Sequence, residues 1–173
     1  VHFPTDPNDD PDEVTKLEAL DARLQAFMPK SGPYDIRGSN LYTVHQRVAA
    51  RFRKGRALLV GDSAHVNSPI GGMGMNSGIH DAFNLADKLV SILNNHEDDI
   101  VLDRYDRQRR KIAVDHTQAQ TIRNKRLLQE KDPAVRQKNQ DDLKRTAADP
   151  KLARQFLLRT SLLQSVRDAA EIQ

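Results

Sequence analysis

Apolar positions along the chain predict one short β segment set between helical stretches. Residues 12–27 place apolar side chains three or four positions apart, which predicts a helix. Residues 34–53 alternate apolar and polar positions and are β-rich at 41–44, which predicts an extended stretch. The run at 57–60 is continuously apolar, as in a strand buried on both faces, and residues 76–93 return to helical spacing.

The sequence after residue 100 predicts a helical, charge-rich C-terminal half. One face of a long helix is marked by Leu102, Tyr105, Ile112, His116, Ala119 and Ile122. Two Asp-Pro pairs, at 132–133 and 149–150, predict the starts of two more helices, because proline is favoured at the first helical position. The apolar face of the last helix is expected from Leu152, Phe156, Leu157, Leu163 and Val166.

This pattern predicts a helix-rich α/β fragment with one buried β–loop–α unit. One or two strands do not form an independent sheet. Either the helices carry the core, or the sheet is completed by chain outside this sequence. The opening Val1-His2-Phe3-Pro4 has neither a Met start nor a targeting segment, so we expect either the middle of a longer protein or a processed end.

Composition narrows the class of protein. A length of 173 residues suits one domain with a core, although only 38% of the residues are hydrophobic. The net charge of +3 is too weak to indicate nucleic acid or an anionic membrane as a partner. Cysteine is absent, which excludes disulfides and thiolate chemistry and fits a reducing compartment, so we expect a cytoplasmic protein. No apolar run approaches the length of a membrane-spanning helix.

The chemistry-bearing segment begins where the apolar run at 57–60 ends. Asp62 follows the predicted strand, at the end of a sheet where α/β proteins bind ligands. Five glycines fall close together at positions 61, 71, 72, 74 and 78, and three of them, Gly71, Gly72 and Gly74, come just before a predicted helix N-terminus. Such a terminus stabilises a ligand that carries or gains negative charge. The alternatives are a tight loop with positive φ angles and nothing bound, and an Asp62 that merely caps a turn.

The glycine spacing does not match the usual phosphate-binding loops. The glycines come about nine residues after the strand, whereas a dinucleotide-binding fingerprint places them directly in the turn that follows it. The Walker pattern is absent from the sequence as well. The loop is therefore not expected to be a standard pyrophosphate cradle.

About thirty-four residues of this segment resemble the second flavin-binding motif of the single-component FAD-dependent aromatic hydroxylases, the para-hydroxybenzoate hydroxylase-like family. Its departures are minor: Ser63 stands for a usual Ala, Asp87 for a common aromatic residue, and Gln108 for a Glu in the following Tyr-x-x-Glu-Arg helix. The matching blocks are Gly61-Asp62-Ser63-Ala64-His65, Pro69, Gly71-Gly72-Met73-Gly74-Met75-Asn76, Asp81-Ala82-Phe83-Asn84-Leu85 and Lys88-Leu89.

The resemblance implies FAD as the cofactor, NADPH or NADH as cosubstrate, and transfer of one oxygen atom from O2 to a phenolic or related ring. It places Asp62 on the ribityl chain of FAD and Pro69 beside the flavin ring, as the catalytic position. It places the cofactor-binding backbone of the flavin pyrimidine edge at Gly72, Gly74, Met75 and Asn76. The implied partner is an aromatic small molecule, with no nucleic acid and no membrane.

The family's N-terminal Gly-x-Gly-x-x-Gly unit, which binds the ADP half of FAD, is not in this sequence, nor is its middle Asp-Gly motif. We therefore expect only the C-terminal part of such an enzyme, inactive alone, with the missing N-terminal half supplied in cis or in trans. One alternative is a non-catalytic companion subunit or remnant that docks with a chain carrying the missing half. Another, within the flavoenzymes, is a related reductase or epoxidase. The expected division is a leader and helix at 1–33, the end of a substrate-domain sheet at 34–53, the C-terminal part of the FAD-binding domain at 54–131, and C-terminal helices at 132–173.

Other candidate sites in the sequence carry weaker signals. The six histidines show no metal-ligand spacing, so no metal site is expected. His65 is expected to be a structural loop residue, and His45 either faces a substrate cavity or is a surface or packing residue. The basic residues between 104 and 111 alternate with aspartates, which predicts a solvated helix face rather than a nucleic-acid site. Ser63 lacks the sequence context of a catalytic nucleophile.

Overall fold

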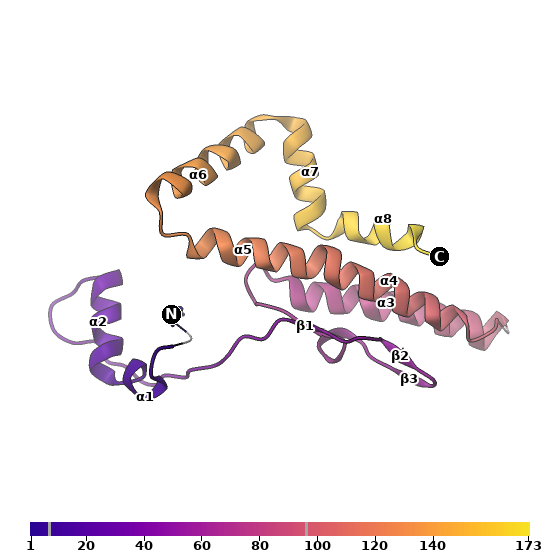
Figure 1. Ribbon diagram of the computed structural model, residues 1–173, viewed down its shortest axis with the longest axis horizontal. Coiled ribbons are helices and arrows are strands. Elements are labelled where there is room, and N and C mark those ends of the chain that lie inside the picture. The colour runs from indigo at the N-terminus through magenta and orange to yellow at the C-terminus, as the bar shows by residue number, and fades with distance from the viewer. Residues whose placement is uncertain (7, 96) are drawn as a thin grey trace. The chain divides into compact units, whose positions relative to one another are not determined.

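The computed structural model describes residues 1–6, 8–95 and 97–173, which form two compact units (Figure 1). The first unit is Val1–Thr43 and the second is Val44–Gln173. Each unit is described by itself.

The first unit contains the predicted N-terminal helix as two pieces, α1 (Pro11–Val14) and α2 (Leu17–Phe27). The break falls at Thr15 and Lys16, because Lys16 takes extended backbone as the residue preceding α2. The Asp21 carboxylate accepts a hydrogen bond of 2.7 Å from the Tyr34 N–H, which holds the chain after the helix against it. No strand forms at 41–44, where the sequence predicted β structure.

Four two-residue strands form two small antiparallel ladders in the second unit. β1 pairs with β4, β2 pairs with β3, and their bounds are Arg47–Val48 for β1, Arg53–Lys54 for β2, Ala57–Leu58 for β3 and His65–Val66 for β4. The strand expected at 57–60 is therefore shorter and more exposed than its apolar run predicts. Only one neighbouring strand lies beside it in the described chain, so it lacks the flanking strands that bury a central position.

Long helices build the rest of the unit. α3 (Met73–Asn95) lies alongside α4 (Val101–Ile112), which continues through the π-helix η2 (Ala113–Gln118) into α5 (Ala119–Gln129) as one rod (Figure 1). The helices predicted over 76–93 and from residue 100 are thereby confirmed. α3 begins three residues earlier than predicted, so the last glycine of the loop, Gly74, belongs to its first turn.

The π-helix rotates the second half of the rod relative to the first. A π turn contains more residues per turn than an α-helix, so side chains beyond it change faces. Ala119 and Ile122, predicted on the buried face with Tyr105 and Ile112, are exposed. Their place is taken mainly by polar side chains. The buried residues of the rod after Ile112 are Ala113, Thr117, Gln120 and Thr121.

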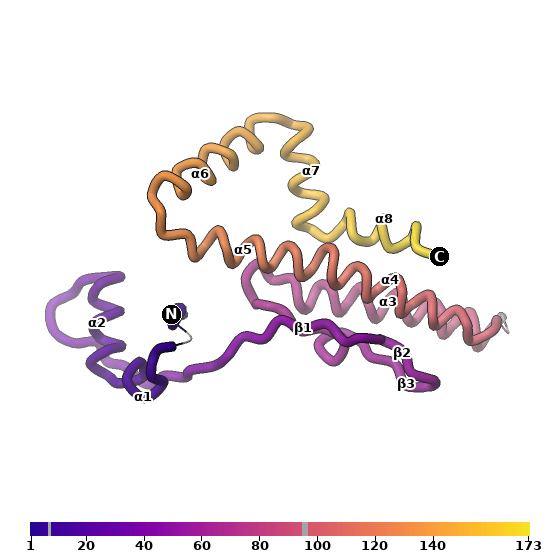
Figure 2. Tube along the Cα trace, in the orientation of Figure 1, coloured from indigo at the N-terminus to yellow at the C-terminus, as the bar shows by residue number. Residues whose placement is uncertain are grey.

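Three further helices follow at the C-terminus, and Figure 2 traces them out from the rod and back to it. They are α6 (Pro133–Ala148), α7 (Pro150–Thr160) and α8 (Leu163–Glu171). Asp132 and Asp149 cap α6 and α7, with proline in the first turn of each helix, as the Asp-Pro pairs predicted. The single helix expected from 150 onward breaks at Leu162, which has a φ of 62°.

Helix α8 returns to α4 and is held there by polar contacts. The Ile172 carbonyl accepts hydrogen bonds from Arg104 Nε at 3.1 Å and Gln108 Nε2 at 2.8 Å. Four of the five apolar residues predicted to face the core from this region are exposed, and the buried side chain at the break is Leu162 instead. The C-terminal helices are therefore joined to the rod more by hydrogen bonds than by a large apolar interface.

The apolar core is small and lies between the strands and the first half of the rod. Phe52 is fully buried, with its ring 6.0 Å from His65 and 6.3 Å from Tyr105 between centroids. Its N–H donates to the Asp106 carboxylate at 2.8 Å. The buried cluster is completed by Ala64, Leu85, Leu102, Tyr105 and Ala113.

Helix α3 turns its polar side inward. The side chains that it buries against the rod include Ser77 and Asp81, both at most 1% exposed. Met73 and Leu85 are also buried, but most of its large apolar side chains lie on the opposite, exposed face. We call this face the α3 apolar stripe: Met75, Ile79, Phe83, Val90 and Leu93. Exposure along this stripe reaches 75% at Met75. The predicted helical periodicity is correct, but within the described residues it does not mark the core.

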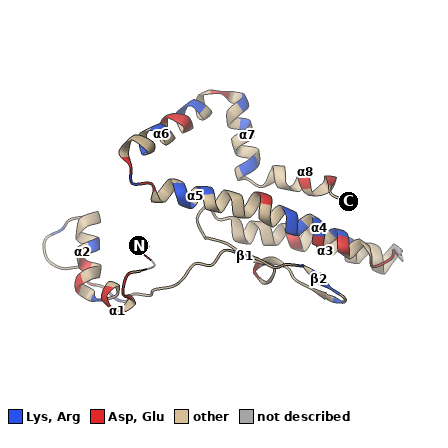
Figure 3. Cartoon of the chain, viewed as in Figure 1, with Lys and Arg blue, Asp and Glu red and all other residues tan. Residues whose placement is uncertain are grey.

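Basic and acidic side chains occur together on the same helices. Basic and acidic side chains alternate along α4 and α6 (Figure 3). Among the helices of the described residues, none is both long enough and apolar enough to cross a membrane.

Replacing Phe52 with alanine is expected to destabilise the protein by about 3–5 kcal/mol, because it leaves a cavity among the core side chains. The matched control is Phe27→Ala, whose ring is 71% exposed and whose loss is expected to cost below about 0.5 kcal/mol. Urea unfolding measures both. Equal losses in the two variants would contradict the placement of Phe52 at the centre of the core.

Candidate functional site

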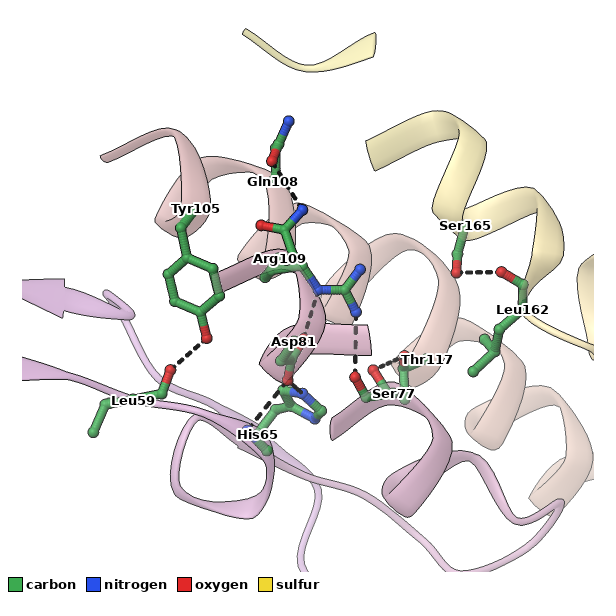
Figure 4. Close-up of polar contacts among 12 residues, drawn as sticks. Leu59, His65, Ser77, Asp81, Tyr105, Gln108, Arg109, Thr117, Leu162 and Ser165 are labelled. Carbon is green, nitrogen blue, oxygen red and sulfur yellow. Dashed lines mark hydrogen bonds and ion pairs between the residues drawn. The ribbon is translucent and has the colours of Figure 1, made fainter. Parts of the chain in front are cut away.

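The geometry around the glycine segment is organised by one buried carboxylate, that of Asp81 on α3 (Figure 4). Its Oδ1 accepts from Arg109 Nε at 2.6 Å, and its Oδ2 lies 2.7 Å from His65 Nε2 and 3.2 Å from the Gly61 N–H. Asp81 is 0% exposed and Arg109 is 2% exposed. One side chain thus connects α4, β4 and the turn at Gly61 to α3.

Arg109 corrects the expectation of a wholly solvated basic face on this helix. Its guanidinium is buried against Asp81, and a second nitrogen lies 3.4 Å from the Ser77 carbonyl. Thr117 of the π-helix adds a hydrogen bond of 3.2 Å to the Ser77 hydroxyl. A buried charge of this kind is tolerated only when it is paired and hydrogen-bonded, as it is here.

The turn that carries Asp62 lies directly on α3. It is a 3-10 turn, η1 (Gly61–Ser63), and a Cβ at Gly78 would lie 3.2 Å from the Gly61 Cα. Gly61 has a φ of 61°, so glycine is favoured there by conformation, whereas glycine at 78 is favoured by the close approach of the two backbones. The Ser63 hydroxyl closes the turn by accepting from the Val60 N–H at 3.0 Å and donating to the Val60 carbonyl at 2.8 Å.

Asp62 itself is exposed at the surface of this turn. Within the described part of the chain, its carboxylate has no hydrogen-bond or ion-pair partner. It therefore differs from Asp81, whose acceptor capacity is filled by protein groups. Asp62 retains its full capacity to accept hydrogen bonds from a ligand.

The glycine loop ends at the N-terminus of α3. The Gly72 N–H donates to the Pro69 carbonyl at 3.0 Å, and Gly71 and Gly72 have φ angles of 96° and 64°. Pro69 is exposed, as are both of these glycines. Positive φ angles, which the tight-loop alternative expected, are therefore present at these two glycines, in a turn that leads directly into the helix at Met73.

Gly74, Met75 and Asn76 form the first turn of α3 rather than the loop before it. Backbone N–H groups in a first turn have no helical acceptor, and the helix dipole adds partial positive charge there. The Asn76 side chain donates to the Gly72 carbonyl at 2.9 Å, which fixes the end of the loop. The structure thus brings the predicted residues 69–76 together at one exposed helix terminus.

Burial shifts the pKa values of two titratable groups beside Asp81 toward their neutral forms. Burial and the nearby Arg109 charge lower the pKa of His80, with Asp81 opposing them. Burial raises the pKa of Tyr105 well above its ordinary range, and the phenol donates to the Leu59 carbonyl at 2.6 Å. His65 is buried on Asp81 and His45 is exposed, so only His65 takes part in this network.

A second polar cluster joins α3 to α4 one to two turns further along. The Lys88 ammonium donates to Asn84 Oδ1 at 2.8 Å and to Gln108 Oε1 at 2.9 Å, and Asn84 Nδ2 donates to Gln108 Oε1 at 3.1 Å. Burial lowers the pKa of Lys88, and Arg104 lowers it further. Gln108 supplies a neutral acceptor where the resembling family carries a Glu, so the ammonium has no carboxylate in this cluster.

The turn that carries the unpaired Asp62 carboxylate therefore lies on the helix whose first turn follows Gly71 and Gly72. A family model described as an FAD binding domain matches residues 1–120. The chain belongs to this family of FAD-binding domains.

Individual relatives are named as monooxygenases or hydroxylases. The chain is 38% identical over 136 residues to a para-nitrophenol 4-monooxygenase of Pseudomonas sp. strain WBC-3, covering 79% of this chain and 34% of that protein. It is 44% identical over 105 residues to a 3-(3-hydroxy-phenyl)propionate/3-hydroxycinnamic acid hydroxylase of Mycolicibacterium smegmatis, covering 61% of this chain and 18% of that protein.

Solved structures show the same fold. The crystal structure of p-nitrophenol 4-monooxygenase from Pseudomonas putida DLL-E4 matches with a TM-score of 0.75 and 34% identity, over 89% of this chain and 39% of that chain. The chain thus spans about a third or less of the length of these curated relatives. The expected resemblance to FAD-dependent aromatic hydroxylases, over part of their length, is confirmed.

The residues that hold the site together were not identified from the sequence. Asp81 and Arg109 were seen only as motif members, since their burial depends on two helices that meet in the fold. The one available signal is the Gly61 and Gly78 pair, because two glycines placed in a strand-end turn and in a helix indicate close backbone approach.

Replacing Asp81 with asparagine is expected to destabilise the protein by about 3–5 kcal/mol, because it leaves the Arg109 charge buried without a counter-charge. Asp87→Asn, at an exposed position on the same helix, is the matched control, with an expected change within about 0.5 kcal/mol. Denaturant unfolding compares the two. A loss at Asp81 no larger than at Asp87 would contradict the central role of this carboxylate.

Replacing Gln108 with glutamate is expected to raise the pKa of Lys88, because a carboxylate then faces the ammonium. In the native protein the pKa of Lys88 lies below its ordinary 10.5, so the folded state binds this proton less tightly than the unfolded chain. Stability therefore gains as the pH rises from the lowered folded pKa toward that ordinary value, and the variant is expected to lose this gain.

The measurement is an NMR titration of Lys88 after reductive methylation, with Gln129→Glu at an exposed position as the control. A Lys88 pKa that is unchanged in Gln108→Glu would show that the ammonium does not contact position 108.

Proposed function

We propose that this chain is the C-terminal part of an FAD-dependent monooxygenase that hydroxylates a phenolic aromatic substrate with NADPH or NADH and O2. The proposal rests on the exposed N-terminus of α3, which follows directly after Gly71 and Gly72. The turn that lies on the same helix carries the unpaired Asp62 carboxylate, and the chain belongs to the FAD-binding family.

The residues present fit FAD on the evidence of the structure. The Asp62 carboxylate has free acceptor capacity, and glycine at 72 and 74 leaves the backbone uncovered at the helix terminus. Asn67 Oδ1, beside Gly74, is buried without a hydrogen-bond partner among the described residues. A polar atom in that state is expected to gain a partner when a ligand binds.

Each site residue has a distinct task in this proposal. Asp62 accepts hydrogen bonds from the ribityl hydroxyls. Gly72 lets the backbone approach the ring closely, and the N–H groups of Gly74, Met75 and Asn76 donate to its electron-rich pyrimidine edge. Pro69 forms a rigid edge of the loop beside the ring. When bound, FAD supplies hydride acceptance from the nicotinamide and activation of O2.

The substrate class follows from the names of the relatives. One relative is named for para-nitrophenol and another for 3-(3-hydroxy-phenyl)propionate, both of which carry a hydroxylated aromatic ring. We therefore assign a phenolic ring to this protein as well. The ring position and the choice between NADH and NADPH are left to residues outside this chain. The cytoplasmic location expected from the sequence stays a prediction.

The remaining part of the FAD-binding domain is assigned to chain outside these residues, in cis or in trans. The α3 apolar stripe supports this assignment, since exposed apolar patches of this kind mark surfaces that are covered in the assembled protein. The residues that bind the ADP half of FAD would lie in that remaining part. This segment alone is then expected to be inactive.

Replacing Asp62 with alanine in the complete protein is expected to weaken FAD binding by roughly 10- to 100-fold, because hydrogen bonds to a charged acceptor are lost. Titration of the apoprotein with FAD, followed by flavin fluorescence, measures this change. Asp87→Ala, at an exposed α3 position, is the control that preserves FAD affinity. An Asp62→Ala apoprotein with native FAD affinity would remove this residue from the proposed site.

A further inference from the structure

The glycine loop is held from the side by Asn124 of α5. Asn124 Nδ2 donates to the Ile70 carbonyl at 3.3 Å, and its Oδ1 accepts from Gln120 Nε2 at 2.8 Å. The Gln120 contact orients the amide, because it identifies the oxygen and turns the nitrogen to the loop. A side chain from a helix that begins more than forty residues after the loop thus fixes the loop backbone.

The same amide explains why position 71 is glycine. A Cβ at Gly71 would overlap the Asn124 Nδ2 atom, and the Gly71 φ of 96° is unfavourable for other residues. The loop backbone and the Asn124 side chain are therefore complementary in shape. This contact fixes the turn immediately before the first turn of α3.

The π-helix η2 is what presents Asn124 to the loop. Beyond it the helix buries Gln120 and Thr121 in place of the apolar Ala119 and Ile122. The same segment also holds the chain ahead of β1, since Gln46 Nε2 donates to the Gln118 carbonyl at 3.1 Å and to Thr121 Oγ1 at 2.8 Å. π turns inside α-helices often accompany functional sites. Here the turn converts a helix face into a set of polar supports.

We infer that Asn124 is a positioning residue for the cofactor loop: it fixes Ile70–Gly72 so that the first-turn N–H groups of α3 face the flavin. The identity of the ligand rests on the proposed function, whereas the loop contact does not. The residue acts through the loop backbone and has no role in the chemistry itself. Its removal is expected to loosen the loop and misalign the donors that stabilise reduced, anionic flavin.

The test compares Asn124→Ala and Asn124→Asp with Gln129→Ala, an exposed amide on the same helix, in the complete protein. Asn124→Asp keeps the size of the side chain but removes the donor to Ile70. Both Asn124 variants are expected to speed hydrogen exchange at the Gly72 amide, whose bond to Pro69 closes the loop. They are also expected to weaken FAD binding about tenfold and to make the reduction potential of the bound flavin more negative.

A double-mutant cycle with Gly71→Ala isolates the contact. Gly71→Ala introduces both an unfavourable φ and the overlap with Asn124. In the double variant Asn124→Ala relieves that overlap, and the cost of losing its donor to Ile70 is measured separately by the single variant. The double variant is therefore expected to bind FAD at least roughly threefold more tightly than the product of the two single effects predicts. Additive effects would overturn the inference.

The outcomes separate this inference from the proposed function. If the native complete protein does not bind FAD, the proposed function fails, and with it the flavin part of this inference, whatever the loop does. If it binds FAD but both Asn124 variants match Gln129→Ala in Gly72 exchange, FAD affinity and flavin potential, the inference alone is overturned. A lowered melting temperature without a changed potential would likewise assign Asn124 a merely structural role.

Discussion

The site depends on one buried carboxylate that is shared by three elements. Asp81 places the turn of Gly61, the strand of His65 and the helix of Arg109 around a single point on α3. Because a buried Arg109 cannot lose its counter-charge without a large penalty, the arrangement of these elements is strongly constrained. Among the described residues, the Asp62 carboxylate can then remain exposed and free of protein partners, since it is not needed to hold the fold together.

The parts of the fold that the sequence predicted are those encoded by local chemistry. The Asp-Pro pairs identified the starts of α6 and α7, because the cap and the proline act within one turn. The glycines at 71 and 72 identified a loop with positive φ angles, and the order of residues from Gly61 to Leu89 identified the flavin motif. Each of these signals lies within a few neighbouring positions.

The features that escaped prediction depend on contacts between distant segments. Burial of Arg109 requires α3 to lie beside α4, and nothing in its basic neighbourhood distinguishes it from exposed residues. Because of the π-helix, Ile122 is exposed and Thr121 is buried. The spacing of a regular α-helix predicts the opposite at Ile122, so the sequence pattern did not indicate this change. Helix α3 was predicted correctly as a helix, yet its polar side faces the described core because Asp81 and Ser77 bond across it.

The exposed α3 apolar stripe affects any attempt to express these residues by themselves. Phe83 and Leu93, on the α3 apolar stripe, are 70% and 74% exposed, so the isolated segment presents an apolar surface to other molecules. Copies of the isolated segment would adhere to one another, and the tendency would grow with concentration and with salts that strengthen apolar association. The residue range chosen for recombinant expression should therefore include the chain that covers the α3 apolar stripe, before any spectroscopy is attempted.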